Sequence, residues 1–118
     1  MSPRILVLDN EPFLLELMEQ ILKSEGYGNV IGVLGYSLPL ERIGVKPDLI
    51  ILDVVAGREV MGARYVQSLN LSQAGKTIPV IVCVETAEQG LAMQAILGQA
   101  VYVLPKPFSI GTFLHTGW

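Results

Sequence analysis

Cysteine and histidine are almost absent from this chain of 118 residues, which contains one of each, Cys83 and His115. A single cysteine cannot form an intramolecular disulfide, and one Cys with one His is too few for a Cys/His zinc cluster. A Ser-His-Asp triad would have to use His115, close to the end of the sequence. Any chemistry of this chain is therefore expected to depend on carboxylates and lysine.

Charged residues are also scarce, at 16% of the chain, against about 25% in a typical soluble domain. Hydrophobic residues make up 51%, which argues against disorder. The formal net charge is −3 and no basic stripe is present, so we expect no direct binding of nucleic acid. The charge is unevenly distributed, because Lys106 is the only charged side chain within residues 89–118.

Long hydrophobic runs are missing as well. Apolar stretches such as residues 79–84 are far shorter than the ~20 residues that span a bilayer. The first residues also lack a signal-peptide pattern. We therefore expect one domain over residues 1–118, located in the cytosol and not in a membrane.

Short apolar runs rich in β-branched residues alternate with segments of helical spacing. Strands are predicted at residues 5–8, 29–34, 48–53, 78–84 and 100–104. Helices are predicted from Pro12 to Gly26, at 37–43, through Met61, Tyr65 and Leu69, at 86–97 with a Thr86/Gln89 capping box, and at 109–116. This (βα)5 order, with strands apolar on both faces, predicts an α/β fold with a doubly wound parallel sheet.

Polar residues follow several of the predicted strands. Asp9 and Asn10 follow the first, Asp53 ends the third, and Lys106 follows the fifth. In open parallel sheets the functional site lies at the carboxyl ends of the strands, so these side chains would converge on one edge. Carboxylate and amide oxygens suit Mg²⁺, a lysine neutralises phosphoryl oxygens, and an aspartate can form an aspartyl-phosphate.

Each of these residues also has a simpler interpretation. Asp9 or Asn10 would serve as a helix cap, Asp53 would end a strand in a turn, and Lys106 would be a solvated loop residue. The coincidence of all of them at one edge favours the functional interpretation.

Four motifs, in order and spacing, carry a resemblance to a known family: ILVLDNEP at 5–12, PDLIILDV at 47–54, IPVIVCV at 78–84 and LPKPF at 104–108. The chain resembles the receiver domain of two-component response regulators over nearly its whole length. The resemblance implies a flavodoxin-like sheet of order 2-1-3-4-5. It also implies a histidine kinase or phosphotransfer protein as partner.

The same resemblance implies roles for individual residues. Asp53 is the expected phosphoacceptor, and Lys106 is the expected phosphate-contacting lysine, with a cis peptide before Pro107. Mg²⁺ is expected at Asp9, Asn10, Asp53 and the Val55 carbonyl. Enzymatic activity would be limited to self-phosphorylation from a phosphodonor and autodephosphorylation.

The sequence departs from the family pattern at several positions. Asn10 stands where a second acid is usual, so Mg²⁺ binding is expected to be weak. Val84 replaces the usual Thr or Ser, and Val103 replaces the aromatic switch residue, with Tyr102 displaced to the neighbouring, opposite-facing position. Thr86 either supplies the missing hydroxyl or caps the following helix.

Three functional hypotheses follow from these observations. The first is a phosphorylatable receiver that signals through the fourth helix, the fifth strand and the last helix. The second is a pseudo-receiver, an interaction module with little or no phospho-switching. The third, an unrelated flavodoxin-like ligand binder, is disfavoured because no G-x-G-x-x-G motif follows the first strand.

The poorly charged segment 89–118 supports a further expectation. Its helix is apolar nearly all round, and such a helix is normally covered on more than one side. A homodimer or a tight partner contact through residues 89–118 would cover it. The alternative explanation of the low charge in this segment is a truncated last helix that has lost its polar end.

Overall fold

The computed structural model describes residues 3–36, 47–54, 57–71, 78–98 and 101–105. Its strands are β1 (Ile5–Asp9), β2 (Val30–Leu34), β3 (Leu49–Asp53), β4 (Val80–Val84) and β5 (Tyr102–Pro105). They form one parallel sheet of order β2-β1-β3-β4-β5, which confirms the predicted fold. The helices predicted at residues 37–43 and 109–116 lie outside the described residues.

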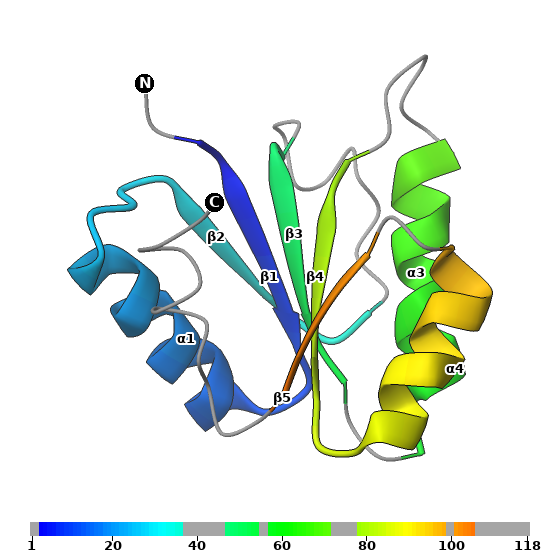
Figure 1. The fold of residues 1–118 in the computed structure, drawn as a ribbon. Coiled ribbons are helices and arrows are strands. Elements are labelled where there is room, and N and C mark those ends of the chain that lie inside the picture. Colours follow the sequence, from blue (N-terminus) through cyan, green and yellow to red (C-terminus); the bar gives the residue numbers. More distant parts are fainter. Residues whose placement is uncertain (1–2, 37–46, 55–56, 72–77, 99–100, 106–118) are drawn as a thin grey trace.

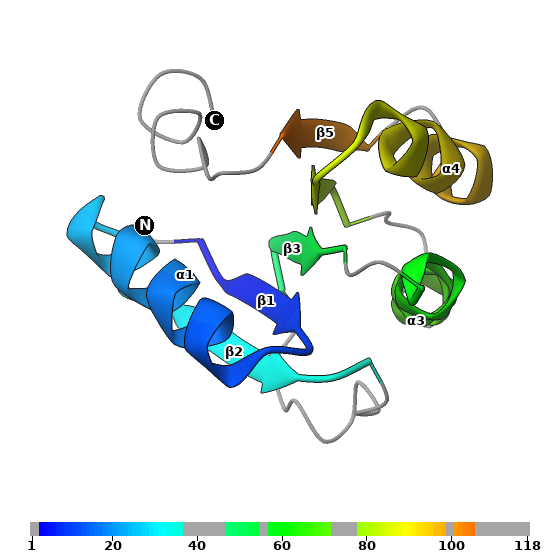
Figure 2. The same ribbon diagram turned by 90° about the horizontal axis from the view of Figure 1, so that it is seen from below.

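Helices cover both faces of the sheet. Helix α1 (Pro12–Ser24) lies on one face, and α3 (Glu59–Leu71) and α4 (Ala87–Leu97) lie on the other, as Figures 1 and 2 show from two directions. Every residue of β1, β3 and β4 is buried, which confirms the strands predicted from uninterrupted apolar runs. Within the described part of the chain, no helix has the length and hydrophobicity needed to span a membrane.

The sheet divides the hydrophobic interior into two clusters. The α1-side core contains Ile5, Val7, Met18, Leu22, Leu49, Ile51, Ile81 and Cys83. The α3/α4-side core contains Leu6, Leu8, Val33, Tyr36, Ile50, Leu52, Val54, Ala63, Tyr65, Val66, Leu69, Ile78, Val80, Val82, Val84, Met93 and Val101. Alternate residues of each central strand therefore belong to opposite cores, as the period of two in a strand requires.

Helix α1 begins and ends as its sequence predicts. Pro12 is its first residue, where a missing N–H removes no helical hydrogen bond. At its end, the N–H groups of Gly26 and Tyr27 donate to carbonyls of the last turn, in a Schellman arrangement in which Gly26 has φ +95°. The cap interpretation of Asp9 and Asn10 is wrong, because Glu11 occupies the N-cap position.

Helix α4 begins with the predicted capping box. The Thr86 hydroxyl oxygen accepts the Gln89 backbone N–H at 3.1 Å, and the Gln89 side-chain oxygen accepts the Glu85 and Thr86 N–H groups. This confirms the interpretation of Thr86 as a helix cap.

Two side-chain hydrogen bonds join α3 and α4, one at each end. Gln89 Nε2 donates to Glu59 Oε2 at 3.4 Å near the start of both helices, and Gln67 Nε2 donates to the Ile96 carbonyl at 2.8 Å near their ends.

The spacing that predicted α3 placed Met61 on its apolar face, but Met61 is 53% exposed. Tyr65 and Leu69 are buried as that spacing requires, so Met61 is the member of the pattern that fails.

Candidate functional site

Asp9 and Asp53 end neighbouring strands and are both completely buried. Leu8 pairs with Leu52 across β1 and β3, so the two aspartates follow at the same level of the sheet. Adjacent strands lie ~4.8 Å apart, and both side chains fall on the face that α1 covers. The structure therefore brings together two of the residues that the sequence singled out.

The turn after β1 is held by hydrogen bonds to Asp9. Its Oδ1 accepts the Glu11 N–H at 3.0 Å, and its main-chain carbonyl accepts the Gly35 N–H at 2.7 Å. Asn10 follows directly, and its buried Nδ2 has no hydrogen-bond partner among the described residues. A buried amide donor of this kind is available to a ligand at the strand edge.

Asn10 also approaches the residue after β2. A Cβ added to Gly35 would lie 3.8 Å from Asn10 Oδ1, and Gly35 adopts φ +91°. This positive φ requires glycine, so the chain turns sharply beside the site.

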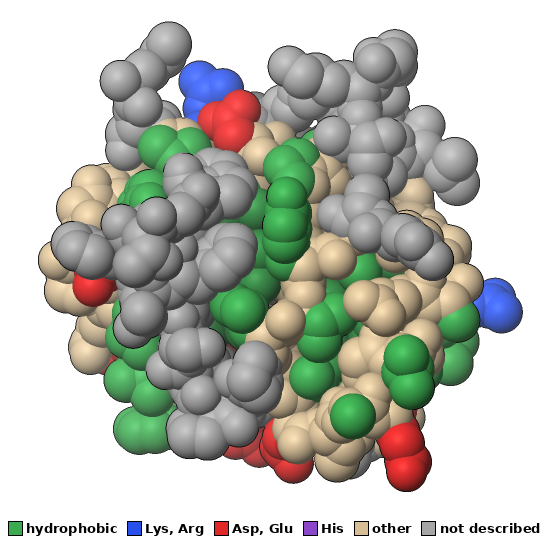
Figure 3. All heavy atoms as spheres, viewed as in Figure 1, with side chains coloured by type: hydrophobic (Ala, Val, Ile, Leu, Met, Phe, Trp, Pro, Cys, Tyr) green, Lys and Arg blue, Asp and Glu red, His purple; other side chains and the backbone are tan. Residues whose placement is uncertain are grey.

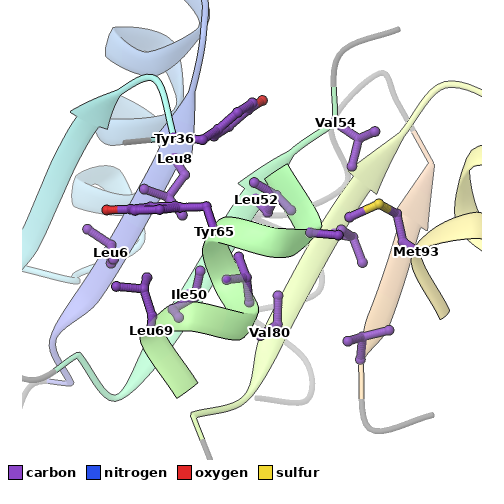
Figure 4. Packing of buried hydrophobic residues seen from close by; sticks show 14 of the residues in the cluster. Leu6, Leu8, Tyr36, Ile50, Leu52, Val54, Tyr65, Leu69, Val80 and Met93 are labelled. Carbon is purple, nitrogen blue, oxygen red and sulfur yellow. The ribbon is translucent and has the colours of Figure 1, made fainter. Parts of the chain in front are cut away.

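Sequence reasoning missed Tyr36, which follows Gly35. The Tyr36 hydroxyl donates a buried hydrogen bond of 2.7 Å to the main-chain carbonyl of Asp53, and the ring belongs to the α3/α4-side core (Figure 4). Burial, and then the charges of Asp9 and Asp53, raise the pKa of Tyr36 well above its ordinary value, while Arg58 lowers it. The hydroxyl therefore stays protonated and able to donate at neutral pH.

Val84 and Val103 occupy the two predicted switch positions as apolar contacts. Val84 is 3% exposed, and Val103 packs against the α3/α4-side core. A Cβ added to Gly90 of α4 would lie 3.0 Å from Val103 Cγ1 and 3.9 Å from Val84 Cγ2. Tyr102, by contrast, is 51% exposed, which confirms that it faces away from Val103.

Two of the expected site residues, Val55 and Lys106, lie outside the described residues, as does Pro107. Strand β5 ends at Pro105, which pairs with Val84, so Lys106 directly follows a residue at the same edge of the sheet. Within the described residues, no group of three or more Asp, Glu, His or Cys side chains is placed to hold a metal ion.

Acidic side chains surround this edge. Glu11, Glu85 and Glu88 are exposed and follow the carboxyl ends of β1 and β4. Figure 3 shows Asp and Glu side chains along the lower border of the molecule, where the strands end in Figure 1. A negative edge of this kind attracts cations and disfavours polyanions.

Comparison with known families identifies the chain. A model described as the response regulator receiver domain matches residues 5–116, and the chain belongs to this family. It is 30% identical over 115 residues to the DNA-binding dual master transcriptional regulator RpaA of Synechocystis, covering 95% of this chain and 46% of that protein. It is also 30% identical over 112 residues to the DNA-binding response regulator MtrA of Mycolicibacterium smegmatis, covering 92% and 46%. The chain thus spans about half the length of these relatives.

Solved structures show the same fold. The chemotaxis protein CheY4 of Vibrio cholerae superimposes with a TM-score of 0.77 at 22% identity, over 98% of this chain and 96% of that one. The signal receiver domain of a histidine kinase from Syntrophus aciditrophicus gives a TM-score of 0.72 at 23% identity, over 96% and 84%. The chain is therefore a receiver domain of two-component signalling, with the CheY-type arrangement of strands and helices.

Proposed function

We propose that this receiver domain accepts a phosphoryl group on Asp53. The observation that carries the proposal is the placement of Asp53 beside Asp9, both buried at the carboxyl edge of a parallel sheet. Asp53 ends the central strand, where the family's phosphoacceptor is expected. The exposed acids Glu11 and Glu85 lack such a setting, because solvent screens them and no neighbouring strand positions them.

The proposed transfer is a simple displacement at phosphorus. A carboxylate oxygen of Asp53 forms a bond to phosphorus while the bond from phosphorus to a histidine nitrogen of the kinase or phosphotransfer protein breaks. The departing imidazole nitrogen takes up a proton. Water later attacks phosphorus and breaks the new O–P bond, which restores the carboxylate and releases inorganic phosphate.

The residues at this edge fit a weakly held Mg²⁺. Asp9 and Asp53 would supply carboxylate oxygens, Asn10 an amide oxygen and Val55 its carbonyl, a set of hard oxygen ligands that suits this ion. When bound, Mg²⁺ would neutralise charge on the phosphoryl oxygens. Lys106 is proposed to contact the phosphoryl oxygens from the end of β5. We also propose a histidine kinase or phosphotransfer protein as the source of the phosphoryl group in the cell, and the cytosol as the location of the reaction.

A mass measurement tests this proposal. The chain is incubated with acetyl phosphate and Mg²⁺, and intact mass is followed with time. We expect one phosphoryl group on the wild type, none on Asp53→Asn, and normal labelling of the matched control Glu85→Gln, which removes an exposed carboxylate. An unlabelled wild type, or equal labelling of Asp53→Asn, contradicts the proposal.

A second candidate function is a pseudo-receiver that binds partners without phospho-switching. The observation that favours it is the apolar packing at the two predicted switch positions, where Val84 is buried and Val103 packs against the α3/α4-side core. Neither side chain provides a hydroxyl to report the phosphoryl group. Amide resonances of residues 84–105 would then shift little when the phosphoryl mimic beryllofluoride binds with Mg²⁺. Large shifts throughout this region would favour the switching receiver instead.

We further propose that output passes through residues 89–118, with a second copy of the chain as the partner, and that this domain does not itself bind nucleic acid. Leu91 on α4 is 66% exposed and Tyr102 on β5 is 51% exposed, which leaves apolar area on this side of the molecule. Sedimentation tests the self-association, and a monomer at high micromolar concentration contradicts it.

A further inference from the structure

The hydroxyl of Tyr36 donates a hydrogen bond to the main-chain carbonyl of Asp53, the expected phosphoacceptor. Tyr36 is 7% exposed, and the bond is 2.7 Å long and buried. A short bond of this kind, shielded from water, holds its acceptor in a fixed position.

The alternation of strand β3 explains where this carbonyl points. Ile50 and Val54 donate their N–H groups towards β4, to the carbonyls of Pro79 and Cys83, whereas Leu49 donates towards β1, to Arg4. Asp53 has the parity of Leu49, so its carbonyl is directed to the β1 side. Strand β1 ends at Asp9, and the chain enters α1 three residues later. Tyr36 therefore donates to the Asp53 carbonyl at the level of the sheet where β1, the strand on that side, ends.

Tyr36 reaches this position from the far side of β1. It follows β2, which lies beyond β1 in the sheet order. Its ring lies beside Leu8 and its hydroxyl points away from β2, towards the end of β3 (Figure 4). The side chain therefore passes over the end of β1 and links the segment after β2 to the Asp53 peptide.

Helix α3 packs closely against the Tyr36 ring. A Cβ added to Gly62 would lie 3.6 Å from Tyr36 Cε2 and 3.4 Å from Leu52 Cδ1. The ring is thus enclosed by β1, β3 and α3, and its hydroxyl has little freedom to leave the carbonyl.

We propose that Tyr36 is a positioning residue for the phosphoacceptor, fixing the Asp53 main chain and thereby the direction of the Asp53 carboxylate. This inference rests on the proposed function, phosphorylation of Asp53. The peptide is held on one side by Tyr36 and, through Val54, on the other side by Cys83. A nucleophile held in this way attacks from one direction, and a small misplacement lowers the rate steeply.

Initial rates of phosphorylation, measured across a range of acetyl phosphate concentrations, test this role. Tyr36→Phe removes the hydroxyl and keeps the ring. Tyr65→Phe is the matched control, because Tyr65 is 8% exposed in the same core. We expect Tyr36→Phe to lower the limiting rate roughly tenfold with little change in the half-saturating concentration, and Tyr65→Phe to stay near the wild type.

A wild-type rate in Tyr36→Phe, or an equal loss in Tyr65→Phe, overturns the positioning role. A second readout separates this role from the proposed function: the ¹³C resonances of the Asp53 carboxyl and carbonyl carbons, without phosphodonor. We expect both to shift in Tyr36→Phe and to stay in place in Tyr65→Phe. If the wild type accepts no phosphoryl group, the proposed function fails, whereas unchanged Asp53 resonances in Tyr36→Phe overturn the inference itself.

Discussion

Gly90 on helix α4 lies directly against Val103 on strand β5. A Cβ at Gly90 would meet Val103 Cγ1 at 3.0 Å, closer than side chains normally approach, whereas a Cβ at Gly62 on α3 would make ordinary contacts of 3.4 Å or more. Both glycines lie within the first turns of their helices. Substitution by alanine at the two positions should therefore change the free energy of unfolding in opposite directions.

We expect Gly90→Ala to lower the free energy of unfolding by ~1 kcal/mol, because Val103 must move or strain. Gly62→Ala should raise it by ~0.5 kcal/mol, since alanine favours the helix and the methyl group fits. Urea unfolding followed by circular dichroism measures both. If Gly90→Ala stabilised the fold instead, Val103 on β5 would have to move aside without strain, which would contradict this prediction.

The end of helix α1 offers a second matched pair of glycines. Gly26 has φ +95° and Gly28 has no positive φ, and a Cβ at either would meet nothing within 4 Å. Gly26→Ala should cost ~1 kcal/mol of folding free energy from backbone strain alone. Gly28→Ala should change it by less than ~0.5 kcal/mol. Equal effects in thermal or urea unfolding would contradict the Schellman ending of α1.

Restoring the missing acid tests the metal site. Asn10→Asp adds a negative charge beside Asp9 and Asp53, so Mg²⁺ affinity should rise roughly tenfold, measured by calorimetry or by amide shifts. Without Mg²⁺, the same variant should unfold more easily, because three carboxylates repel one another. The control Glu11→Gln, at an exposed position, should leave affinity nearly unchanged. Equal Mg²⁺ affinity of Asn10→Asp and the wild type would argue against Asn10 as a ligand.

Alkaline pH should destabilise the fold through Tyr36. Burial and the carboxylates of Asp9 and Asp53 raise the pKa of this hydroxyl in the folded chain, against the lowering effect of Arg58. The unfolded chain therefore releases the proton first, so the stabilisation is complete below about pH 10 and is lost as pH rises further. Unfolding at about pH 9 and pH 11 measures the loss, which should be smaller in Tyr36→Phe than in the exposed control Tyr102→Phe. An identical pH dependence in both variants would contradict this assignment.

Local patterns predicted the elements whose signals are contained in short stretches of sequence. The buried strands β1, β3 and β4 follow from apolar runs, and the ends of α1 and α4 follow from Gly26 and from the Thr86 capping box. Asp9 and Asp53 were predicted at one edge because the order of a parallel sheet brings strand ends together. The family resemblance added the strand order and the expected chemistry of that edge.

Contacts between distant segments could not be predicted in the same way. Tyr36 reaches Asp53 only because the chain after β2 passes over the end of β1, and no periodicity in residues 30–36 indicates that path. The bonds of Gln67 and Gln89 to the neighbouring helix depend likewise on how α3 and α4 pack together. The placement of Met61 on the buried face of α3 was wrong, because helical spacing alone does not determine which part of a helix face the core covers.

The two hydrogen bonds that join α3 and α4 affect which motions are open to this receiver. A state in which α4 shifts alone has lost both bonds, the one at Glu59 and the one at Ile96. At ~1 kcal/mol each, this loss lowers the population of such a state roughly thirtyfold. A displacement that keeps α3 and α4 together avoids that loss. The two hydrogen bonds therefore favour displacements in which a signal that leaves through α4 also moves α3.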